Sequence, residues 1–242
     1  MTTRHTGHVK RLAAPIKYPL LRKETKYTVK IHGGPHNLTN SVPLLLVLRD
    51  ILKYAKNQKE VKAVLNENSV YIDGKIRKDI RLPIGLMDVV SIRKTGENFR
   101  ILFGQNGKVK LVKINDHESK VKLCKILNKT IIKKGKIQLN LHDGRNIIVD
   151  KGHYKTGDSV LISVPEQEIK KHVAIEKGVK VYIMDGTHIG ELAVLHDFKP
   201  QGGSQPDRVI LTTEGGETFE TLEEYIFVLG KEKPEIAIEG ER

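Results

Sequence analysis

Histidine, aspartate and cysteine side chains are the residues of this chain whose types and spacing could support metal binding or catalysis. His142 and Asp143 are adjacent, but Gly144 follows them between two alternating apolar segments, where Asp-Gly favours a hairpin turn. The tripeptide His188-Ile189-Gly190 matches part of a nucleotide-binding motif of some tRNA synthetases. That motif begins a helix in a large α/β domain, which this sequence does not predict. Both segments are therefore interpreted as structural turns.

The remaining chemical candidates are also weak. Cys124 is the only cysteine, so an internal disulfide and a cysteine-rich zinc site are excluded. It lies in an apolar segment with no evident base beside it, which is typical of a buried, unreactive thiol. Four histidines lie in a basic segment that disfavours a bound cation, namely His5, His8, His32 and His36. Neither a phosphate-binding loop nor a dinucleotide fingerprint occurs. We therefore expect no catalytic residues, metal, cofactor or small-molecule substrate.

The charge of the chain indicates a polyanionic partner instead. Lysine and arginine number 42 against 29 acidic residues, which gives a net charge of +13. The net charge is +7 for residues 1–42, +5 for 43–104, +7 for 105–170 and −6 for 171–242. A polyanion is therefore expected along the first two-thirds of the chain, with the acidic C-terminal region turned away from it or toward a basic protein. Aromatic residues are only 5% of the chain, which favours recognition of folded RNA by its backbone and shape over stacking on unpaired bases.

The elements that must position these basic residues begin with residues 1–42, a basic N-terminal arm. Pro15, Pro19 and Pro35 break any long helix there. The arm is either a disordered basic tail or, given its apolar residues, partly packed on the following domain or on RNA. We expect it to become ordered only when RNA binds, because its small apolar area cannot offset the entropy of ordering.

Residues 43–94 predict a small domain of two helices, a hairpin and a strand. Apolar residues recur with helical spacing from Leu44 to Ala55, and Arg49, Lys53 and Lys56 would share the opposite helix face. A shorter helix is expected over residues 58–66. The segment 70–76, with its Asp-Gly pair, predicts a tight hairpin, and residues 89–92 predict a further strand.

From about residue 95 the helical period disappears and short strand candidates alternate with turns. Residues 95–170 are expected to form a central β-barrel-like domain, with strands near 101–103, 108–114, 121–126, 136–141, 147–149 and 159–164. Residues 171–242 predict a second small all-β module that ends in an acidic tail. The fold class is therefore a multidomain α+β protein. The longest apolar run is far shorter than the roughly 20 residues of a membrane helix, and the basic start lacks an apolar signal region. We therefore expect no membrane association and a reducing, cytoplasmic setting.

Seven specific segments are spread over nearly the whole length: His8 to Pro15, Gly34-Pro35-His36, Ser41 to Leu44, Leu48 to Asp50, Val70 to Arg77, Gly85 to Val90 and Lys136 to Asn146. In these segments the sequence closely resembles the e-type small-subunit ribosomal protein four family of archaea and eukaryotes. The short C-terminal region resembles archaeal members. The resemblance implies that residues 43–94 are an RNA-binding domain shared with some pseudouridine synthases. It also implies that 171–242 form an SH3-like KOW barrel, with Gly190 as its characteristic glycine.

The same resemblance implies a structural, non-enzymatic protein of the small ribosomal subunit, located on cytoplasmic ribosomes. Its partners would be small-subunit rRNA and neighbouring ribosomal proteins, the latter possibly through the acidic region. Two alternatives are a free RNA-binding KOW factor and an RNA-modifying enzyme, although the catalytic aspartate motif of the pseudouridine synthases is absent. The residues expected to bind rRNA are Arg4, His8, Lys10, Arg11, Lys17, Arg22, Lys23, Arg49, Lys53, Lys56, Lys75, Arg77, Lys78 and Arg81.

Overall fold

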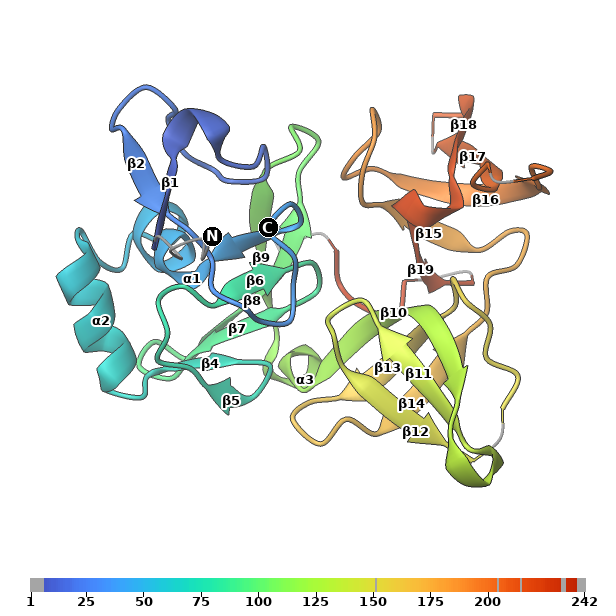
Figure 1. The fold of residues 1–242 in the computed structure, drawn as a ribbon, viewed down its shortest axis with the longest axis horizontal. Coiled ribbons are helices and arrows are strands. Elements are labelled where there is room, and N and C mark those ends of the chain that lie inside the picture. Colours follow the sequence, from blue (N-terminus) through green and yellow to red (C-terminus); the bar gives the residue numbers. More distant parts are fainter. Residues whose placement is uncertain (1–6, 151, 204, 214, 232–233, 239–242) are drawn as a thin grey trace, which may run out of the picture.

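A computed structural model of the chain describes residues 7–150, 152–203, 205–213, 215–231 and 234–238. Within these residues, three antiparallel five-stranded sheets follow one another along the chain (Figure 1). The N-terminal sheet carries the helices, the central sheet projects away from it, and the C-terminal sheet packs beside both. The chain is thus a mostly β member of the expected α+β class. None of the helices in the described ranges has the length and apolar character needed to cross a bilayer.

The N-terminal sheet extends further along the chain than expected. Its strand order is β5-β4-β7-β8-β9. The strands are β4 Val70–Ile72, β5 Lys75–Ile76, β7 Val89–Ile92, β8 Glu97–Phe103 and β9 Val109–Ile114. A separate pair joins β3 Ser41–Pro43 to β6 Pro83–Gly85. Because β8 pairs directly with β7, this unit continues past the expected boundary at residue 94 and ends near Ile114.

The first predicted helix is much shorter than its apolar pattern suggested. The structure has α1 at Leu44–Leu46, followed by a π-helical turn, η2, at Val47–Ile51. The chain then turns at Lys53, whose φ of 56° lies in the left-handed region. All of Leu44 to Leu48 are buried, so the apolar run reflects burial on every side rather than one face of a long helix. The prediction that Arg49, Lys53 and Lys56 share a helix face is therefore wrong.

The second helix and the hairpin are confirmed. Helix α2, Gln58–Asn66, begins after Asn57, whose side chain accepts a hydrogen bond from the Glu60 backbone N–H at 3.0 Å. Val61 and Leu65, four residues apart, are fully buried against the sheet. Strands β4 and β5 form the expected hairpin across a two-residue turn.

The described part of the arm is folded onto this unit. Strand β1, His8–Lys10, pairs with β2, Tyr27–Val29, and a 3-10 turn, η1, covers Arg11–Ala13. Ala14, Tyr18 and Leu20 are buried in the same apolar cluster as α1 and the N-terminal sheet. Of the two interpretations of the arm, a disordered tail or a segment partly packed on the following domain, residues 7–42 show the packed one.

The central sheet is built around one long strand, β10, with the order β12-β11-β10-β13-β14. The first half of β10 pairs with β13, and its second half pairs with β11 after a bulge. A short helix, α3, precedes β10, and a 3-10 turn, η3, connects it to β11. Their bounds are α3 Asp116–Ser119, β10 Val121–Ile131, η3 Lys133–Gly135, β11 Ile137–Leu141, β12 Asn146–Val149, β13 Ser159–Ser163 and β14 Ile169–Val173. The inner face has its own small apolar core, which includes Cys124 and Leu139.

The C-terminal sheet has the order β18-β17-β16-β15-β19, with a 3-10 turn, η4, before its last strand. The bounds are β15 Lys180–Ile183, β16 Leu192–Lys199, β17 Arg208–Thr213, β18 Thr218–Leu222, η4 Glu223–Tyr225 and β19 Ile226–Gly230. The expected all-β module is confirmed as a sheet with an apolar core of its own, which centres on Val181, Leu195 and Val228.

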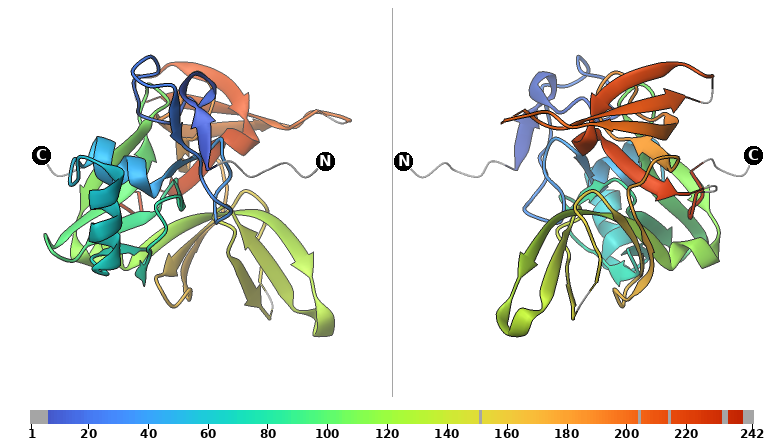
Figure 2. Two further views of the ribbon diagram at one scale, coloured as in Figure 1. Left: turned by 60° about the vertical axis from the view of Figure 1, so that its left-hand side comes forward. Right: turned by 90° about the vertical axis from the view of Figure 1, so that its right-hand side faces the viewer.

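The three sheets lie beside one another (Figure 2), and polar contacts at specific points join them. The Tyr182 hydroxyl of β15 accepts a hydrogen bond from the Phe103 backbone N–H at 2.9 Å and donates to its carbonyl oxygen. Gly190, with a φ of 85°, lies so close to this strand end that a Cβ there would be 2.7 Å from the Phe103 carbonyl oxygen. From the central sheet, the Lys125 ammonium donates to three backbone carbonyl groups, those of Glu223, Glu224 and Ile226.

Candidate nucleic-acid interface

The β4–β5 hairpin presents the most accessible basic side chains of the N-terminal unit. Asp73 and Gly74 at its turn have φ values of 48° and 72°, so both adopt the left-handed conformation of a type I′ turn. Lys75, Arg77 and Lys78, just beyond the turn, are exposed. None of the three makes an ion pair with a residue that the structure describes, so their charges are free for a ligand.

Four further predicted lysines are exposed and carry no ion pair within the described ranges: Lys10, Lys23, Lys53 and Lys56. They lie on β1, on the loop after η1 and on the segment that connects η2 to α2. Because this segment is a turn rather than a helix, Lys53 and Lys56 project from irregular backbone. Free lysines on separate elements suit a polyanion whose phosphates follow a curved path.

Four of the predicted basic residues instead serve the protein itself. Arg11 is buried and contacts Glu24 at 3.1 Å. Lys17 is also buried, contacts Asn40 and Asp185, and lies 4.3 Å above the Phe103 ring, and burial lowers its pKa. The remaining two are Arg22, which donates to the carbonyl groups of Leu12, Ala14 and Pro15, and Arg49, which forms a two-pronged pair with Asp50. These side chains position the arm and η2, so they are not free phosphate ligands.

Each of the last three residues predicted to bind rRNA, His8, Arg81 and Arg4, lies in a different setting. His8 is exposed on β1, with its ring edge toward Tyr27 at 4.6 Å between centroids. Arg81 is half-buried beside β6. Arg4 lies outside the described residues.

A buried cluster of charged side chains, which was not predicted, joins the arm, the N-terminal unit and the central sheet. Lys122 of β10 is fully buried, and its ammonium lies 2.8 Å from Asp73, 2.5 Å from Asp88 and 2.9 Å from Asp143. Two more cations complete the cluster. Arg145 contacts Asp73 at 2.6 Å and Asp143 at 3.2 Å, and His36 contacts Asp88 at 2.9 Å. We call these six residues the junction cluster. No sequence pattern links them, because the pairs are between 2 and 72 positions apart.

The protonation of the junction cluster follows from these contacts. Burial alone would lower the pKa of Lys122, but the three carboxylates outweigh it and hold the pKa well above its usual value. Burial alone would raise the pKa of Asp88 and Asp143, but neighbouring cations dominate. The pKa of Asp88 lies far below its usual value, and that of Asp143 is lowered to about 2. Lys122, Asp88 and Asp143 are therefore charged near neutral pH, and the cluster acts as a structural clamp.

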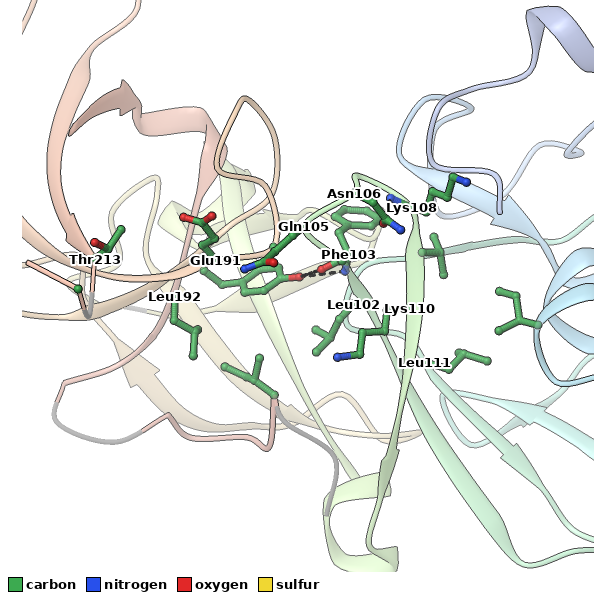
Figure 3. Close-up of a pocket in the computed structure, with 17 residues that line it drawn as sticks. Leu102, Phe103, Gln105, Asn106, Lys108, Lys110, Leu111, Glu191, Leu192 and Thr213 are labelled. Atoms are coloured by element: carbon green, nitrogen blue, oxygen red, sulfur yellow. Dashed lines mark hydrogen bonds between the residues drawn. The ribbon is translucent and has the colours of Figure 1, made fainter. Parts of the chain in front are cut away.

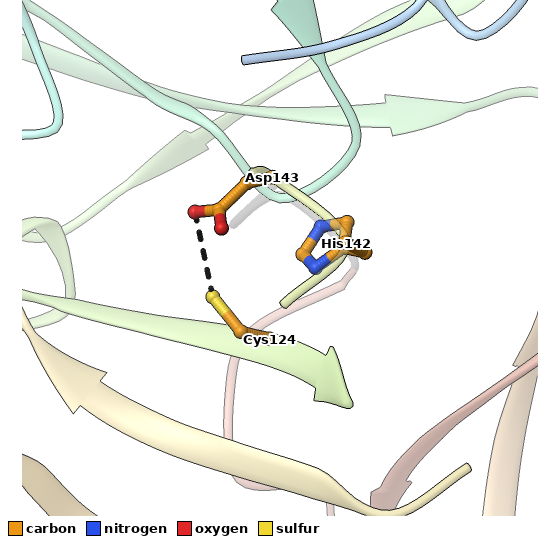
Figure 4. A group of neighbouring side chains, drawn as sticks. All are labelled: Cys124, His142 and Asp143. Atoms are coloured by element: carbon orange, nitrogen blue, oxygen red, sulfur yellow. Dashed lines mark hydrogen bonds between the residues drawn. The ribbon is translucent and has the colours of Figure 1, made fainter. Parts of the chain in front are cut away.

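Cys124, His142 and Asp143 lie close together and offer one possible ligand atom each (Figure 4). Asp143, however, already faces Lys122 and Arg145, whose positive charges oppose a metal ion. The His142 ring lies within 3.2 Å both of the Lys125 backbone N–H and of the Leu86 carbonyl oxygen, and burial lowers its pKa to about 4. Burial also raises the pKa of the Cys124 thiol, as expected for an unreactive cysteine. The turn interpretation of His142 to Gly144 is confirmed, and these residues do not fit a metal site.

A cleft of about 1040 Å³ separates β8 and β9 from the C-terminal sheet (Figure 3). Gln105, Asn106, Lys108 and Lys110 line one side, and Glu191 faces them from the other. Among the described lining residues there is neither a histidine nor a cysteine. The ionisable side chains of this lining are those of Lys108, Lys110, Tyr182 and Glu191, and the Tyr182 hydroxyl is held by the Phe103 backbone.

Comparison with known proteins identifies the family. The model of ribosomal family S4e matches residues 95–169, and the model of the RS4NT domain matches residues 5–39. The chain is 48% identical over 239 residues to small ribosomal subunit protein eS4 of Methanocaldococcus jannaschii, covering 96% of this chain and 97% of that one. It is 46% identical to small ribosomal subunit protein eS4 of Methanococcus aeolicus over the same shares of each chain.

The structure agrees with this likeness. The crystal structure of the 30S ribosomal protein S4e from Thermoplasma acidophilum superposes with a TM-score of 0.70 at 30% identity, covering 82% of this chain and 98% of that one. The chain belongs to the S4e family of ribosomal proteins. The resemblance read from the sequence, including its archaeal character, is confirmed.

Proposed function

We propose that this protein is a structural constituent of the small ribosomal subunit that binds and stabilises folded rRNA. The observation that carries the proposal is its 48% identity, over nearly the whole chain, to a small ribosomal subunit protein. This family is a structural component of the ribosome rather than an enzyme. As a ribosomal component the protein would work in the cytoplasm.

Exposed, unpaired cations are the best candidates for contacts with phosphates. Lys75, Arg77 and Lys78 stand on a rigid hairpin, so they lose little side-chain and backbone freedom when a phosphate binds. Lys10, Lys23, Lys53 and Lys56 would extend this contact. His8, Arg81 and Arg4 stay proposed rRNA ligands on the basis of the family resemblance alone. Arg11, Lys17, Arg22 and Arg49 would act indirectly by holding the arm and η2 in place.

The proposed domain assignment follows the three sheets. The N-terminal unit, with α2 and the hairpin, is the RNA-binding domain of the family type, and it extends to about residue 114. The central sheet forms the second domain, to about residue 173. The C-terminal sheet is the SH3-like KOW module, supported by its five antiparallel strands and by Gly190 at a close backbone contact. Its acidic surface, which includes Glu217, Glu220 and Glu224, would face a basic neighbouring ribosomal protein.

Sedimentation tests membership of the ribosome. The protein should migrate with small subunits in a one-to-one ratio and stay bound through a high-salt wash. A protein that washes off completely, yet still binds RNA in isolation, would instead be the free RNA-binding KOW factor. Modification of a base after incubation with rRNA would support the enzymatic alternative.

Charge reversal tests the RNA-binding residues. The double variant Arg77→Glu/Lys78→Glu should weaken binding to small-subunit rRNA and lower the slope of log K against log salt by roughly 1 to 2 units, because two phosphate contacts are lost. The matched control is Lys177→Glu/Lys231→Glu, which changes the net charge equally at two exposed positions near the C-terminal sheet. If the two variants have equal slopes of log K against log salt, the hairpin is not part of the RNA interface.

A further inference from the structure

The outward face of the central sheet has an unusual composition. Across β10, β11 and β12, Asn128 pairs with Asn140 and Asn140 with Asn146, while Thr130 pairs with Gln138 and Gln138 with Ile148. Directly opposed residues of antiparallel strands place their side chains on the same face of the sheet. These six side chains therefore form one surface, which we call the amide face: Asn128, Thr130, Gln138, Asn140, Asn146 and Ile148.

The burial pattern shows that the amide face points away from the core. On the alternate positions, Ile126, Leu139 and Leu141 are buried in the apolar core of this sheet. On the amide face, Asn128, Thr130 and Asn146 are exposed, and Ile148 is 56% exposed. Gln138 and Asn140 are half-buried and linked by a hydrogen bond of 2.8 Å, which fixes their orientation.

The amide face contains no ionisable side chain, although 29% of the chain is charged. The exposed face of the C-terminal sheet, by comparison, carries paired charges. There Glu220 pairs across strands with Lys199 at 2.6 Å and with Arg208 at 3.7 Å. Neutral amides and hydroxyls, by contrast, can each donate and accept hydrogen bonds. The wide, shallow minor groove of an RNA helix presents 2′-hydroxyls and base edges, which also do both.

The surrounding charge identifies the class of partner. The segment from Val121 to His142 contains six lysines and no acidic residue. Lys129, Lys133 and Lys136 are exposed on the hairpin of β10 and β11, which projects from the body of the protein (Figures 1 and 2). Lys136 pairs with Asp150, just after β12, at 2.7 Å, and Lys129 donates to the Tyr154 carbonyl oxygen at 3.1 Å. Lys133 has no acidic partner in the described ranges. A neutral hydrogen-bonding face bordered by cations complements the groove and the flanking phosphates of an RNA helix.

We propose that the amide face is a second RNA-contacting surface, which lies against the minor groove of a folded rRNA helix. The inference rests on the proposed ribosomal function and adds a site to it, separate from the basic residues of the N-terminal unit. Lys133, in the turn between β10 and β11, contacts a phosphate at its border, and Ile148 contributes a small apolar contact at its edge.

The first test separates neutral from ionic contacts. The variant Asn128→Ala/Asn146→Ala removes two exposed amides that are not part of the core. It should weaken binding to small-subunit rRNA about tenfold, since two hydrogen bonds contribute about 1 to 3 kcal/mol, and the slope of log K against log salt should not change. The matched control is Thr187→Ala/Thr218→Ala, which alters two exposed polar residues near the C-terminal sheet and should bind like the unaltered protein. Equal affinities of the amide variant and the control would overturn the proposal. Failure of the unaltered protein to bind this RNA would instead overturn the proposed function.

The second test identifies the neighbour directly. Cys124 is the only cysteine and is fully buried, so Thr130→Cys introduces a single accessible thiol in the amide face. An iron–EDTA group attached there, in reconstituted small subunits, should cleave the rRNA backbone at a defined site, whereas the same group on Thr218→Cys should give a different pattern. Cleavage of a ribosomal protein without cleavage of rRNA from position 130 would assign the face to a protein partner and refute the proposal.

Discussion

Replacement of Lys122 by methionine tests whether the junction cluster holds the sheets together. Methionine keeps the length and apolar character of the lysine stem but removes the ammonium group. Asp73, Asp88 and Asp143, all within 2.9 Å of that group, would then be buried with only Arg145 and His36 as cations. The substitution therefore leaves one carboxylate in the junction without a matching positive charge.

The expected effect is large because a buried charge without its partner is strongly unfavourable. Removing one member of a buried ion pair costs about 3 to 5 kcal/mol. For a chain of this size, 1 kcal/mol corresponds to about 2 to 4 °C in the midpoint of thermal unfolding. We expect the midpoint of Lys122→Met to fall by about 10 °C. The control Lys59→Met, at an exposed position of α2, should change stability by less than about 0.5 kcal/mol.

A double variant provides the decisive comparison. In Lys122→Met/Asp143→Asn, Asp73 keeps Arg145 and Asp88 keeps His36, so each remaining carboxylate has one cation. The double variant should therefore recover at least about 1 kcal/mol relative to Lys122→Met. Unfolding followed by far-UV circular dichroism and by tyrosine fluorescence measures both changes. Destabilisation of Lys122→Met by less than 1 kcal/mol, or additive effects in the double variant, would refute the clamp.

Three further measurements follow from the structure. Because the pKa of Asp143 is lowered from 3.8 to about 2, its ionisation stabilises the fold above pH 4. About 2 kcal/mol of the free energy of unfolding should be lost between pH 4 and pH 2. In acid titrations of the unfolding midpoint, Asp143→Asn should flatten this pH dependence. Gly190→Ala should lower the free energy of unfolding by about 2 kcal/mol, because a Cβ at this φ of 85° would clash with the Phe103 carbonyl oxygen. The control Gly202→Ala, at a position with open space around it, should leave stability in denaturant unfolding unchanged. Iodoacetamide should modify the buried Cys124 at least about a hundredfold more slowly in the native protein than in denaturant.

Local patterns predicted much of the fold. The hairpin at residues 70–76 and most strands of the second and third sheets follow from alternation and Asp-Gly turns, which act over a few residues. The helix from Leu44 was predicted too long because a fully buried apolar run has no polar face to mark its end. The pairing of β8 and β9 with the N-terminal sheet, although both lie beyond residue 94, was not predicted for a related reason. Nothing in the local sequence distinguishes a strand that extends one sheet from a strand that begins another.

The candidate interface was predicted less well, since a basic residue looks alike whether its partner is a phosphate or a carbonyl group of the same chain. Arg11, Lys17 and Arg22 were assigned to RNA on charge alone, yet tertiary contacts engage them. Conversely, the amide face escaped prediction because it has no charge. Its one local signal was the alternation of polar amides with apolar residues from Ile137 to Leu141, which predicts a sheet with one neutral outer face.

The contrast between these two kinds of residue bears on how the protein meets its partner. Cations that pair with other residues of the chain, such as Arg11 and Lys17, fix the geometry of the arm. The free cations near it, Lys10 and Lys23, then act from a preorganised surface. The junction cluster preorganises the amide face in the same way, because Lys122 and Arg145 anchor β10 and the turn before β12 to the N-terminal unit. Loss of the junction should therefore weaken RNA binding at the amide face without altering any residue on it, so that Lys122→Met should show the same tenfold loss as the amide variant.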